Sequence, residues 1–264
     1  MTNPAFGPTN PDFGKTAGDY AKHRHGFPPE LFDRLAAFGV GRDDQRVLDL
    51  GTGTGTVARG LALRGCTVTA LDPAEKMMEQ ARALDAEAGV QVRYVVGKAE
   101  ETGLAEKSFD VVTAGQCWHW FDRPKAAAEV LRLLAPGGRL VICHYDWIPL
   151  PGNVVYATER LIEKHNPAWK AGGGLGMHPL WTVDTGAAGF VAIETFSFDL
   201  PAIYSHEDWR GRVRASAGIS ASLAPAAVEA FDREHAALLA REFPEDPLAV
   251  HHRCWALVAR KPGG

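Results

Sequence analysis

The spacing of apolar and polar positions predicts strands alternating with helices along most of the chain. Short continuous apolar runs between turn residues are typical of buried strands, and apolar positions three and four apart are typical of helices. Strands are predicted at residues 46–50, 67–71, 92–96, 109–114, 139–144, 190–198 and 251–260. Helices are predicted after the first strand, at 154–165 and 225–242, and from starts near Pro28, Pro73 and Pro124. This order favours an α/β fold.

The alternation of predicted strands and helices is less regular in two stretches, one on each side of the sixth predicted strand. Residues 147–188 contain a helical segment and the glycine-rich AGGGLGMHP, and residues 199–247 read as helices with little strand signal. We expect residues 19–264 to form one domain with two cap inserts there. Residues 1–18, rich in Pro, Gly and Asn, are predicted to be a mobile arm.

A glycine loop follows the first predicted strand. The strand carries Asp49 near its end, and Gly51, Gly53 and Gly55 then allow a sharp turn and close approach of a ligand to the backbone. The next strand ends on Asp72, which is placed to accept hydrogen bonds from a ribose diol. Strand, glycine turn, helix, strand and acid together predict a Rossmann-like nucleotide site.

The register of the glycines narrows the choice of cofactor. A dinucleotide fingerprint requires a small third residue, and Thr56 stands at that position. The Asp49 carboxylate would repel a pyrophosphate but suits an ammonium or sulfonium ligand. No Gly-Lys-Ser/Thr follows, so a P-loop is excluded. An NAD(P) oxidoreductase is therefore disfavoured.

With these features the chain resembles the class I S-adenosylmethionine-dependent methyltransferases. Further matching segments are DPAEKMM, GKAEETGLAEKSFDVV and VLRLLAPGGRLVI. GQCWHWFD and YAKHRHGFPPELF resemble the type-11, trans-aconitate-methyltransferase-like subgroup, although His25 and Phe27 depart from its usual residues. The resemblance implies a seven-stranded Rossmann-like sheet of order 3-2-1-4-5-7-6, its last strand antiparallel, with helices on both faces and a mainly helical cap.

The resemblance also implies which residues bind S-adenosylmethionine and release S-adenosylhomocysteine. Tyr20 and Arg24 would close over the methionine end, Asp72 would bind the ribose, and the Gln116 carbonyl would accept from the ammonium. Lys98 stands where many relatives have an acid, which puts the usual hydrogen bond to the adenine amino group in doubt. The expected cofactor-binding residues are Tyr20, Arg24, Asp49, Gly51, Thr52, Gly53, Asp72, Pro73, Met77, Ala99, Glu100 and Gln116.

His119 is the best candidate for a general base, because an imidazole titrates near neutral pH and follows the fourth strand. A histidine satisfied by a backbone carbonyl is the alternative, and a carboxylate acceptor would need no base. Expected substrate-binding residues are Trp118, His119, His144 and Trp147. Arg210, Arg212 and Arg214 could bind an anionic substrate, but a solvated helix face is the safer interpretation.

Charge, hydropathy and cysteine content limit the classes of molecule that the chain is expected to bind. The net charge of −4 gives no electrostatic case for nucleic acid, and no apolar run reaches transmembrane length. Four widely spaced cysteines without a CxxC pair indicate a reduced, cytoplasmic protein with neither zinc nor disulfides. We expect a monomer or homodimer acting on a small-molecule carboxylate, hydroxyl or activated carbon. A protein of the same fold that binds the cofactor without methyl transfer, such as a cyclase or binding module, is the alternative.

Overall fold

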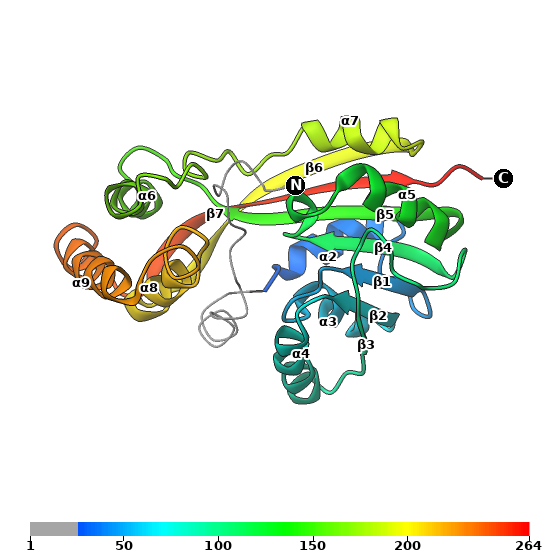
Figure 1. Ribbon diagram of the computed structural model, residues 1–264, viewed down its shortest axis with the longest axis horizontal. Coiled ribbons are helices and arrows are strands. Elements are labelled where there is room, and N and C mark those ends of the chain that lie inside the picture. Colours follow the sequence, from blue (N-terminus) through cyan, green and yellow to red (C-terminus); the bar gives the residue numbers. More distant parts are fainter. Residues whose placement is uncertain (1–25, 264) are drawn as a thin grey trace. The chain divides into compact units, whose positions relative to one another are not determined.

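The computed structural model describes residues 26–263, so the predicted arm 1–18 and the candidates Tyr20 and Arg24 lie outside the described residues. The described chain contains a seven-stranded mixed sheet of order β3-β2-β1-β4-β5-β7-β6 (Figure 1). This order confirms the predicted topology. The strands are β1 (Arg46–Leu50), β2 (Thr67–Asp72), β3 (Arg93–Val96), β4 (Phe109–Gly115), β5 (Leu134–Trp147), β6 (Val191–Tyr204) and β7 (Leu248–Arg260).

The chain divides into two compact units. Unit 2 comprises residues 26–145, 177–198 and 254–264, and unit 1 comprises residues 1–25, 146–176 and 199–253. The predicted inserts correspond only partly to unit 1, because residues 177–188 belong to unit 2. The strands β5, β6 and β7 each contribute residues to both units.

Unit 2 contains the parallel part of the sheet. Strand β1 pairs in parallel with β2 and β4, β2 with β3, and β4 with β5. Its helices are α2 (Pro29–Ala37), α3 (Thr56–Ala62), α4 (Glu75–Ala88), η2 (Trp118–Trp120), α5 (Arg123–Leu133) and α7 (Leu180–Ala187). The starts of α2, α4 and α5 agree with the sequence predictions to within two residues, whereas η2 and α7 were not predicted.

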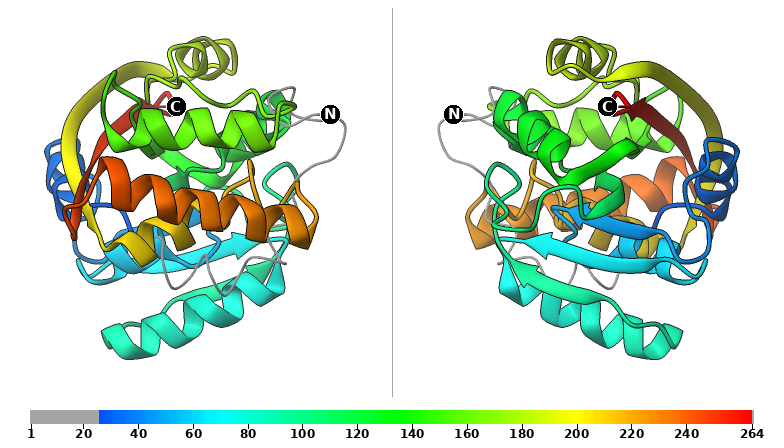
Figure 2. Two further views of the ribbon diagram at one scale, coloured as in Figure 1. Left: turned by 90° about the vertical axis from the view of Figure 1, so that its left-hand side faces the viewer. Right: turned by 90° about the vertical axis from the view of Figure 1, so that its right-hand side faces the viewer.

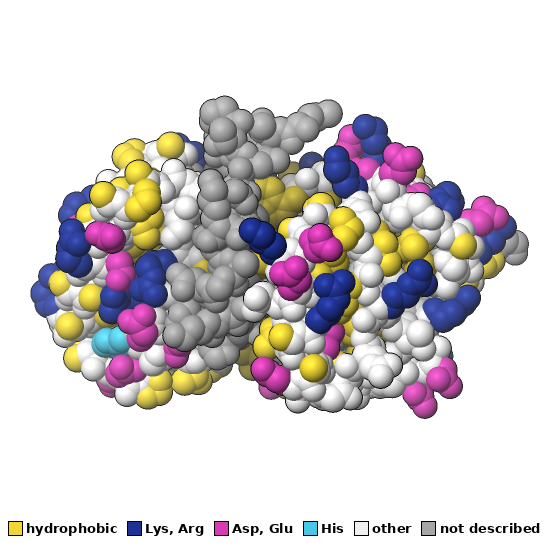
Figure 3. All heavy atoms as spheres, turned by 60° about the horizontal axis from the view of Figure 1, so that its bottom comes forward, with side chains coloured by type: hydrophobic (Ala, Val, Ile, Leu, Met, Phe, Trp, Pro, Cys, Tyr) yellow, Lys and Arg dark blue, Asp and Glu magenta, His cyan; other side chains and the backbone are white. Residues whose placement is uncertain are grey.

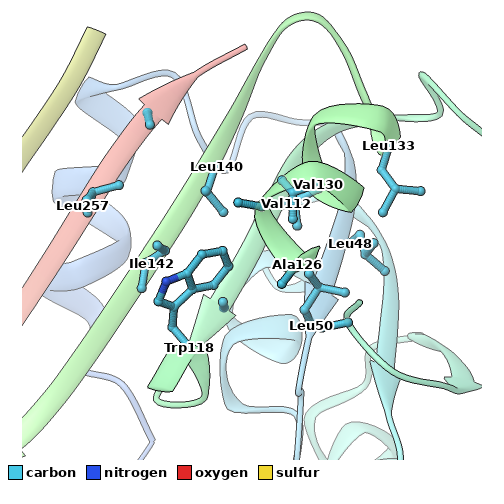
Figure 4. Packing of buried hydrophobic residues seen from close by; sticks show 14 of the residues in the cluster. Leu48, Leu50, Val112, Trp118, Ala126, Val130, Leu133, Leu140, Ile142 and Leu257 are labelled. Carbon is cyan, nitrogen blue, oxygen red and sulfur yellow. The ribbon is translucent and has the colours of Figure 1, made fainter. Parts of the chain in front are cut away.

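Side chains alternate between two apolar clusters on the two faces of this sheet, so helices cover both faces as predicted. Val47 packs with α2 and α3, whereas Leu48 packs with α5 in the other cluster (Figure 4). The final strand confirms the predicted alternation, because its face with Cys254, Ala256 and Val258 joins the α2–α3 cluster. A strand buried on both faces holds the residues at its carboxyl end in fixed positions.

The predicted turn at residues 136–138 lies within β5. Strand pairing passes from Leu134 opposite Phe109 to Arg139 opposite Val111, so β5 has extra residues at this irregularity. Gly137 has a φ of +74° there, which suits a residue without a side chain. The turn residues were thus correctly located, but they interrupt a strand instead of preceding one.

The described part of unit 1 contains the helices α6 (Val154–His165), α8 (His206–Arg214) and α9 (Pro225–Glu242). Helices α6 and α9 run side by side, and α8 also packs on α9 (Figure 2). Phe231 and Trp209 are fully buried within this unit. The predicted bounds of α6 and α9 are confirmed.

Charges of both signs are interspersed over the face shown in Figure 3. Among the described helices, none combines the length and the apolar character that a membrane crossing requires. All four cysteines are buried and free.

Candidate functional site

The glycine loop between β1 and α3 depends on left-handed backbone conformations. Gly51, Gly53 and Gly55 have φ values of +60°, +56° and +77°. A Cβ at Gly51 would lie 2.8 Å from Cβ of Cys117, so packing also requires a glycine there. At Gly53 the nearest atom, Cε of Met77, would lie 3.7 Å away. The loop is therefore closed by packing at Gly51 but leaves room beside Gly53.

Asp72 ends β2 and is fixed by backbone donors. Its Oδ2 accepts from the Gly53 N–H at 2.9 Å, and its Oδ1 accepts from the Ala74 N–H at 2.8 Å. Burial raises the pKa of this carboxyl, whereas the two N–H donors lower it. A carboxylate has about four acceptor positions, so roughly two remain for a ligand hydroxyl pair.

Asp49 is held by hydroxyl groups. Thr52 Oγ1 donates to Oδ2 at 2.7 Å, and Thr113 Oγ1 donates to Oδ1 at 2.6 Å. The carboxyl is almost fully buried, and burial raises its pKa to about 6 despite these donors. Thr113, on β4, was not foreseen, because its partnership with Asp49 depends on the pairing of β1 with β4.

A buried ion pair supports the loop and was also not foreseen. Arg59 Nε lies 2.9 Å from Asp85 Oδ1, and the Tyr94 hydroxyl donates to Asp85 Oδ2 at 2.7 Å. Arg59 also donates to the Thr54 carbonyl at 2.8 Å. A Cβ at Gly55 would lie 2.8 Å from the Tyr94 hydroxyl, so this ion pair stands directly against the loop.

The other expected cofactor residues flank this loop with differing exposure. Met77 and Ala99 are buried, whereas Pro73 is exposed. Glu100 Oε1 accepts the Asp122 N–H at 2.8 Å, which ties the segment after β3 to the start of α5. The structure thus gives Glu100 a structural partner, and its role toward adenine stays a prediction.

The segment after β4 begins with a strained residue. Gln116 has a φ of +57°, and its Nε2 donates to the Tyr145 carbonyl at 2.5 Å. Trp118 is fully buried between the strands and α5, beside Ile142 (Figure 4). The indole of Trp118 packs in this core cluster, and its predicted contact with substrate stays a prediction.

Three imidazoles of unit 2 form a row, which we call the histidine row: His119, His144 and His178. The His119 and His144 ring centroids lie 5.4 Å apart, and those of His144 and His178 lie 4.3 Å apart. His178 stacks on Trp181 with centroids 4.0 Å apart and planes 4° from parallel. The structure therefore brings two predicted residues, His119 and His144, together with His178.

His144 and His178 each offer a ring nitrogen, and these two atoms lie within 4.8 Å of one another. Catalytic zinc sites use three protein ligands, so this pair alone does not make such a site within unit 2. The expectation that the chain binds no metal stays a prediction.

Trp147 belongs to unit 1 and is half-buried there. Its Nε1 donates to Glu159 Oε1 at 2.9 Å, and the guanidinium of Arg212 lies over its ring. Burial raises the pKa of Glu159, and the donors from Gly173 and Trp147 lower it. Within unit 1, Trp147 thus contacts a carboxylate, a guanidinium and the Trp209 ring, and its predicted substrate role stays a prediction.

Residues 48–142 match the family described as a methyltransferase domain. This match covers less than half of the chain, so it shows that the segment is similar to a methyltransferase domain. An uncharacterized methyltransferase of Mycobacterium tuberculosis is 43% identical over 117 residues, which cover 44% of this chain and 45% of that relative. The chain thus spans less than half the length of that curated relative.

Solved structures show the same fold. The YcgJ protein of Bacillus subtilis gives a TM-score of 0.57 at 24% identity, covering 89% of this chain and 98% of that chain. A phosphoethanolamine N-methyltransferase of Haemonchus contortus in complex with S-adenosyl-L-methionine gives a TM-score of 0.57 at 22% identity. The match covers 94% of this chain and 57% of that chain. The domain match and these neighbours support a class I methyltransferase with S-adenosylmethionine as cofactor.

The methyltransferase domain includes every described residue expected to bind the cofactor, from Asp49 to Gln116. It also includes His119, whereas His144 and His178 follow it. The comparisons do not distinguish the trans-aconitate-like subgroup. The expected acceptor residues therefore depend on parts of the chain that the family match does not reach.

Proposed function

We propose that the chain is a class I methyltransferase that transfers a methyl group from S-adenosylmethionine to a small-molecule acceptor by in-line displacement. The observation that carries the proposal is Asp72, held by the glycine loop at the end of β2 within the methyltransferase domain. The acceptor would be a carboxylate, a hydroxyl or an activated carbon, as the resemblance of GQCWHWFD to the trans-aconitate-like subgroup favours. Four buried free cysteines support a reducing, cytoplasmic location, and we propose a monomer or homodimer.

The loop residues suit an adenosine ligand. The unused acceptor positions of Asp72 suit two ribose hydroxyls, and the open space at Gly53 lets a ligand approach the backbone. Bound S-adenosylmethionine supplies an electrophilic methyl group on a sulfonium. Asp49 lies behind the loop, and its carboxylate would stabilise a nearby positive charge.

His119 would act on the acceptor from the segment after β4. Its ring lies 4.7 Å from that of Trp120 and 5.4 Å from that of His144, measured between centroids. A hydroxyl acceptor would lose its proton to the imidazole as it attacks, whereas a carboxylate would need only a hydrogen bond. The aromatic surroundings would exclude water and so favour a transfer in which charge is dispersed.

Isothermal titration with S-adenosylmethionine tests cofactor binding. We expect binding by the wild type and a loss of about tenfold to hundredfold in Asp72→Asn, because hydrogen bonds to a charged group contribute about 1.5–3 kcal/mol. Asp110→Asn is the matched control, since Asp110 pairs with Arg46 at the start of β1 and should leave the affinity within about twofold. Absence of binding to the wild type would exclude the proposal.

Formation of S-adenosylhomocysteine tests the transfer itself. Incubation with carboxylate, hydroxyl and activated-carbon acceptors should release it for at least one class. A protein that binds the cofactor but releases none would instead be the alternative of the same fold that does not transfer methyl. His119→Asn then separates the acceptor classes: a rate loss of about 100-fold or more indicates a base, and a smaller loss indicates a carboxylate.

A further inference from the structure

Helix α8 places three arginines at every second position, and their partners differ. Arg210 and Arg214 both bind Asp232 on α9, Arg214 through Nη1 at 2.7 Å. Both also contact Glu207 at 3.2 Å. These two side chains are therefore neutralised within unit 1, and their charges connect α8 to α9.

Arg212 points to another side of the helix, because two residues rotate the helix by about 200°. Its Cζ lies 4.8 Å from the ring centroid of Trp147, a distance typical of a cation–π contact. Tyr204, which is almost fully buried, also contributes to the electrostatic surroundings of the guanidinium. Trp147 is itself fixed by its hydrogen bond to Glu159 and by an edge contact with Trp209. The guanidinium is thus held in one orientation.

Arg212 differs from its two neighbours in having no ion pair. No carboxylate oxygen of residues 26–263 lies within 4.0 Å of its nitrogens. Burial lowers the pKa of this guanidinium, while Tyr204 and the more distant charge of Asp146 raise it. An arginine stays protonated all the same, so the charge of this half-buried side chain has no ion-pair partner among residues 26–263. Such a charge costs free energy unless an anion neutralises it.

We propose that unit 1 binds a carboxylate-bearing small molecule at Arg212. A guanidinium has five N–H donors, and its planar edge matches a carboxylate. A monoanion fits better than a phosphate dianion, because Arg212 supplies one positive charge and Asp146 adds a negative one nearby. The site lies wholly in unit 1 and does not depend on methyl transfer.

Isothermal titration of the full chain with succinate tests the site, at constant ionic strength and with succinamide as the uncharged probe. We expect saturable succinate binding and a loss of tenfold or more in Arg212→Gln. Arg210→Gln removes the same charge from the same helix, but its side chain is already paired, so affinity should stay within about threefold. Succinamide should bind at least tenfold more weakly than succinate.

A second measurement, by NMR, uses the wild type alone. Its Arg212 Nε–H resonance should shift on addition of succinate, whereas its Arg210 Nε–H resonance should not. The proposal fails if the wild type shows no saturable binding, if Arg212→Gln binds like the wild type, or if succinamide binds as well as succinate. Tighter binding of inorganic phosphate than of succinate would also overturn it. S-adenosylmethionine binding, measured in parallel, reports on the proposed function separately.

Discussion

The carboxylates of unit 2 and the arginines of unit 1 are fixed by different kinds of contact. Asp72 is held by backbone N–H groups of a turn that the glycine spacing already specifies. Arg210 and Arg214 are held by Asp232, a side chain on another helix. Backbone geometry set by a short motif is readable from sequence, whereas pairing between helices requires knowledge of how the helices pack.

The same contrast separates Arg212 from its neighbours. All three arginines lie on one short helix, and the sequence predicts the same solvated surroundings for each of them. The structure gives two of them carboxylate partners and the third an indole face. The solvated helix face favoured by the sequence therefore describes none of them, because what each side chain meets is decided by α9, Trp147 and Tyr204.

The largest expected effect concerns the core of unit 1. Phe231→Ala removes a fully buried ring from α9 and should cost about 3–5 kcal/mol. Hydrogen exchange should show the loss of protection mainly in α6, α8 and α9, and much less in β1, β2 and β4. Arg233→Ala, at an exposed position on the same helix, should change stability by about 0.5 kcal/mol or less. Equal loss of protection in the β1–β4 region would show that the units unfold as one.

The two units should respond to acid in opposite directions. Burial lowers the pKa of His235 in unit 1 to about 4, so the unfolded chain takes up a proton first. Unit 1 should lose about 2–3 kcal/mol as the pH falls from about 6.5 to 4. Burial raises the pKa of Asp49 in unit 2 to about 6, so unit 2 should lose a similar amount as the pH rises from about 4 through 6.

Hydrogen exchange at pH 6.5 and 4.5, corrected for the intrinsic rates, measures how the free energy of unfolding of each unit changes with pH. His235→Gln should reduce the pH dependence of unit 1 and leave that of unit 2 unchanged. Asp49→Asn should do the reverse. Parallel slopes in the two units would contradict the assignment of either group.

Much of the fold was predictable because unit 2 is built from local signals. The bounds of β1, β2, β3 and β4 follow from apolar runs to within one residue, and the loop follows from Gly51, Gly53 and Gly55. The apolar runs did not predict that β5 continues to Trp147 and β6 to Tyr204. The predicted alternation in β7 was confirmed because a strand between two layers sends successive side chains to opposite faces. The sheet order came from the family resemblance, and the structure confirms it.

The site was predictable only where position along the chain fixes position in space. Asp49 was identified, but its partner Thr113 lies 64 residues away, on β4. Trp118 was expected to bind substrate because it follows β4, yet one turn of η2 directs it into the core. His178 could be named from the sequence only as one residue that could line the acceptor pocket, and its stacking on Trp181 and its place beside His144 depend on tertiary packing.

A smaller effect tests why the loop needs glycine. Gly51→Ala combines a left-handed φ with a contact of 2.8 Å to Cys117, and should cost about 2–5 kcal/mol, about 1–2 for the left-handed conformation and about 1–3 for overpacking. Gly103→Ala has a similar φ of +68° but no atom within 4 Å of the new Cβ, so it should cost only about 1 kcal/mol. Urea denaturation of both variants gives the difference, and equal costs would show that packing against Cys117 contributes nothing.

The smallest expected effect compares helix caps of the two units. Ser205 caps α8 through its hydroxyl, which accepts the Asp208 N–H at 3.0 Å, so Ser205→Ala should cost about 1 kcal/mol and Ser205→Gly a few tenths. Asp122 caps α5 at the longer distance of 3.4 Å from the Lys125 N–H, so Asp122→Ala should cost less than Ser205→Ala. Thermal unfolding of the three variants orders these costs. If the Asp122 variant were the least stable, this cap would contribute more than its hydrogen-bond distance suggests. Helix capping would then contribute more to unit 2 than to unit 1.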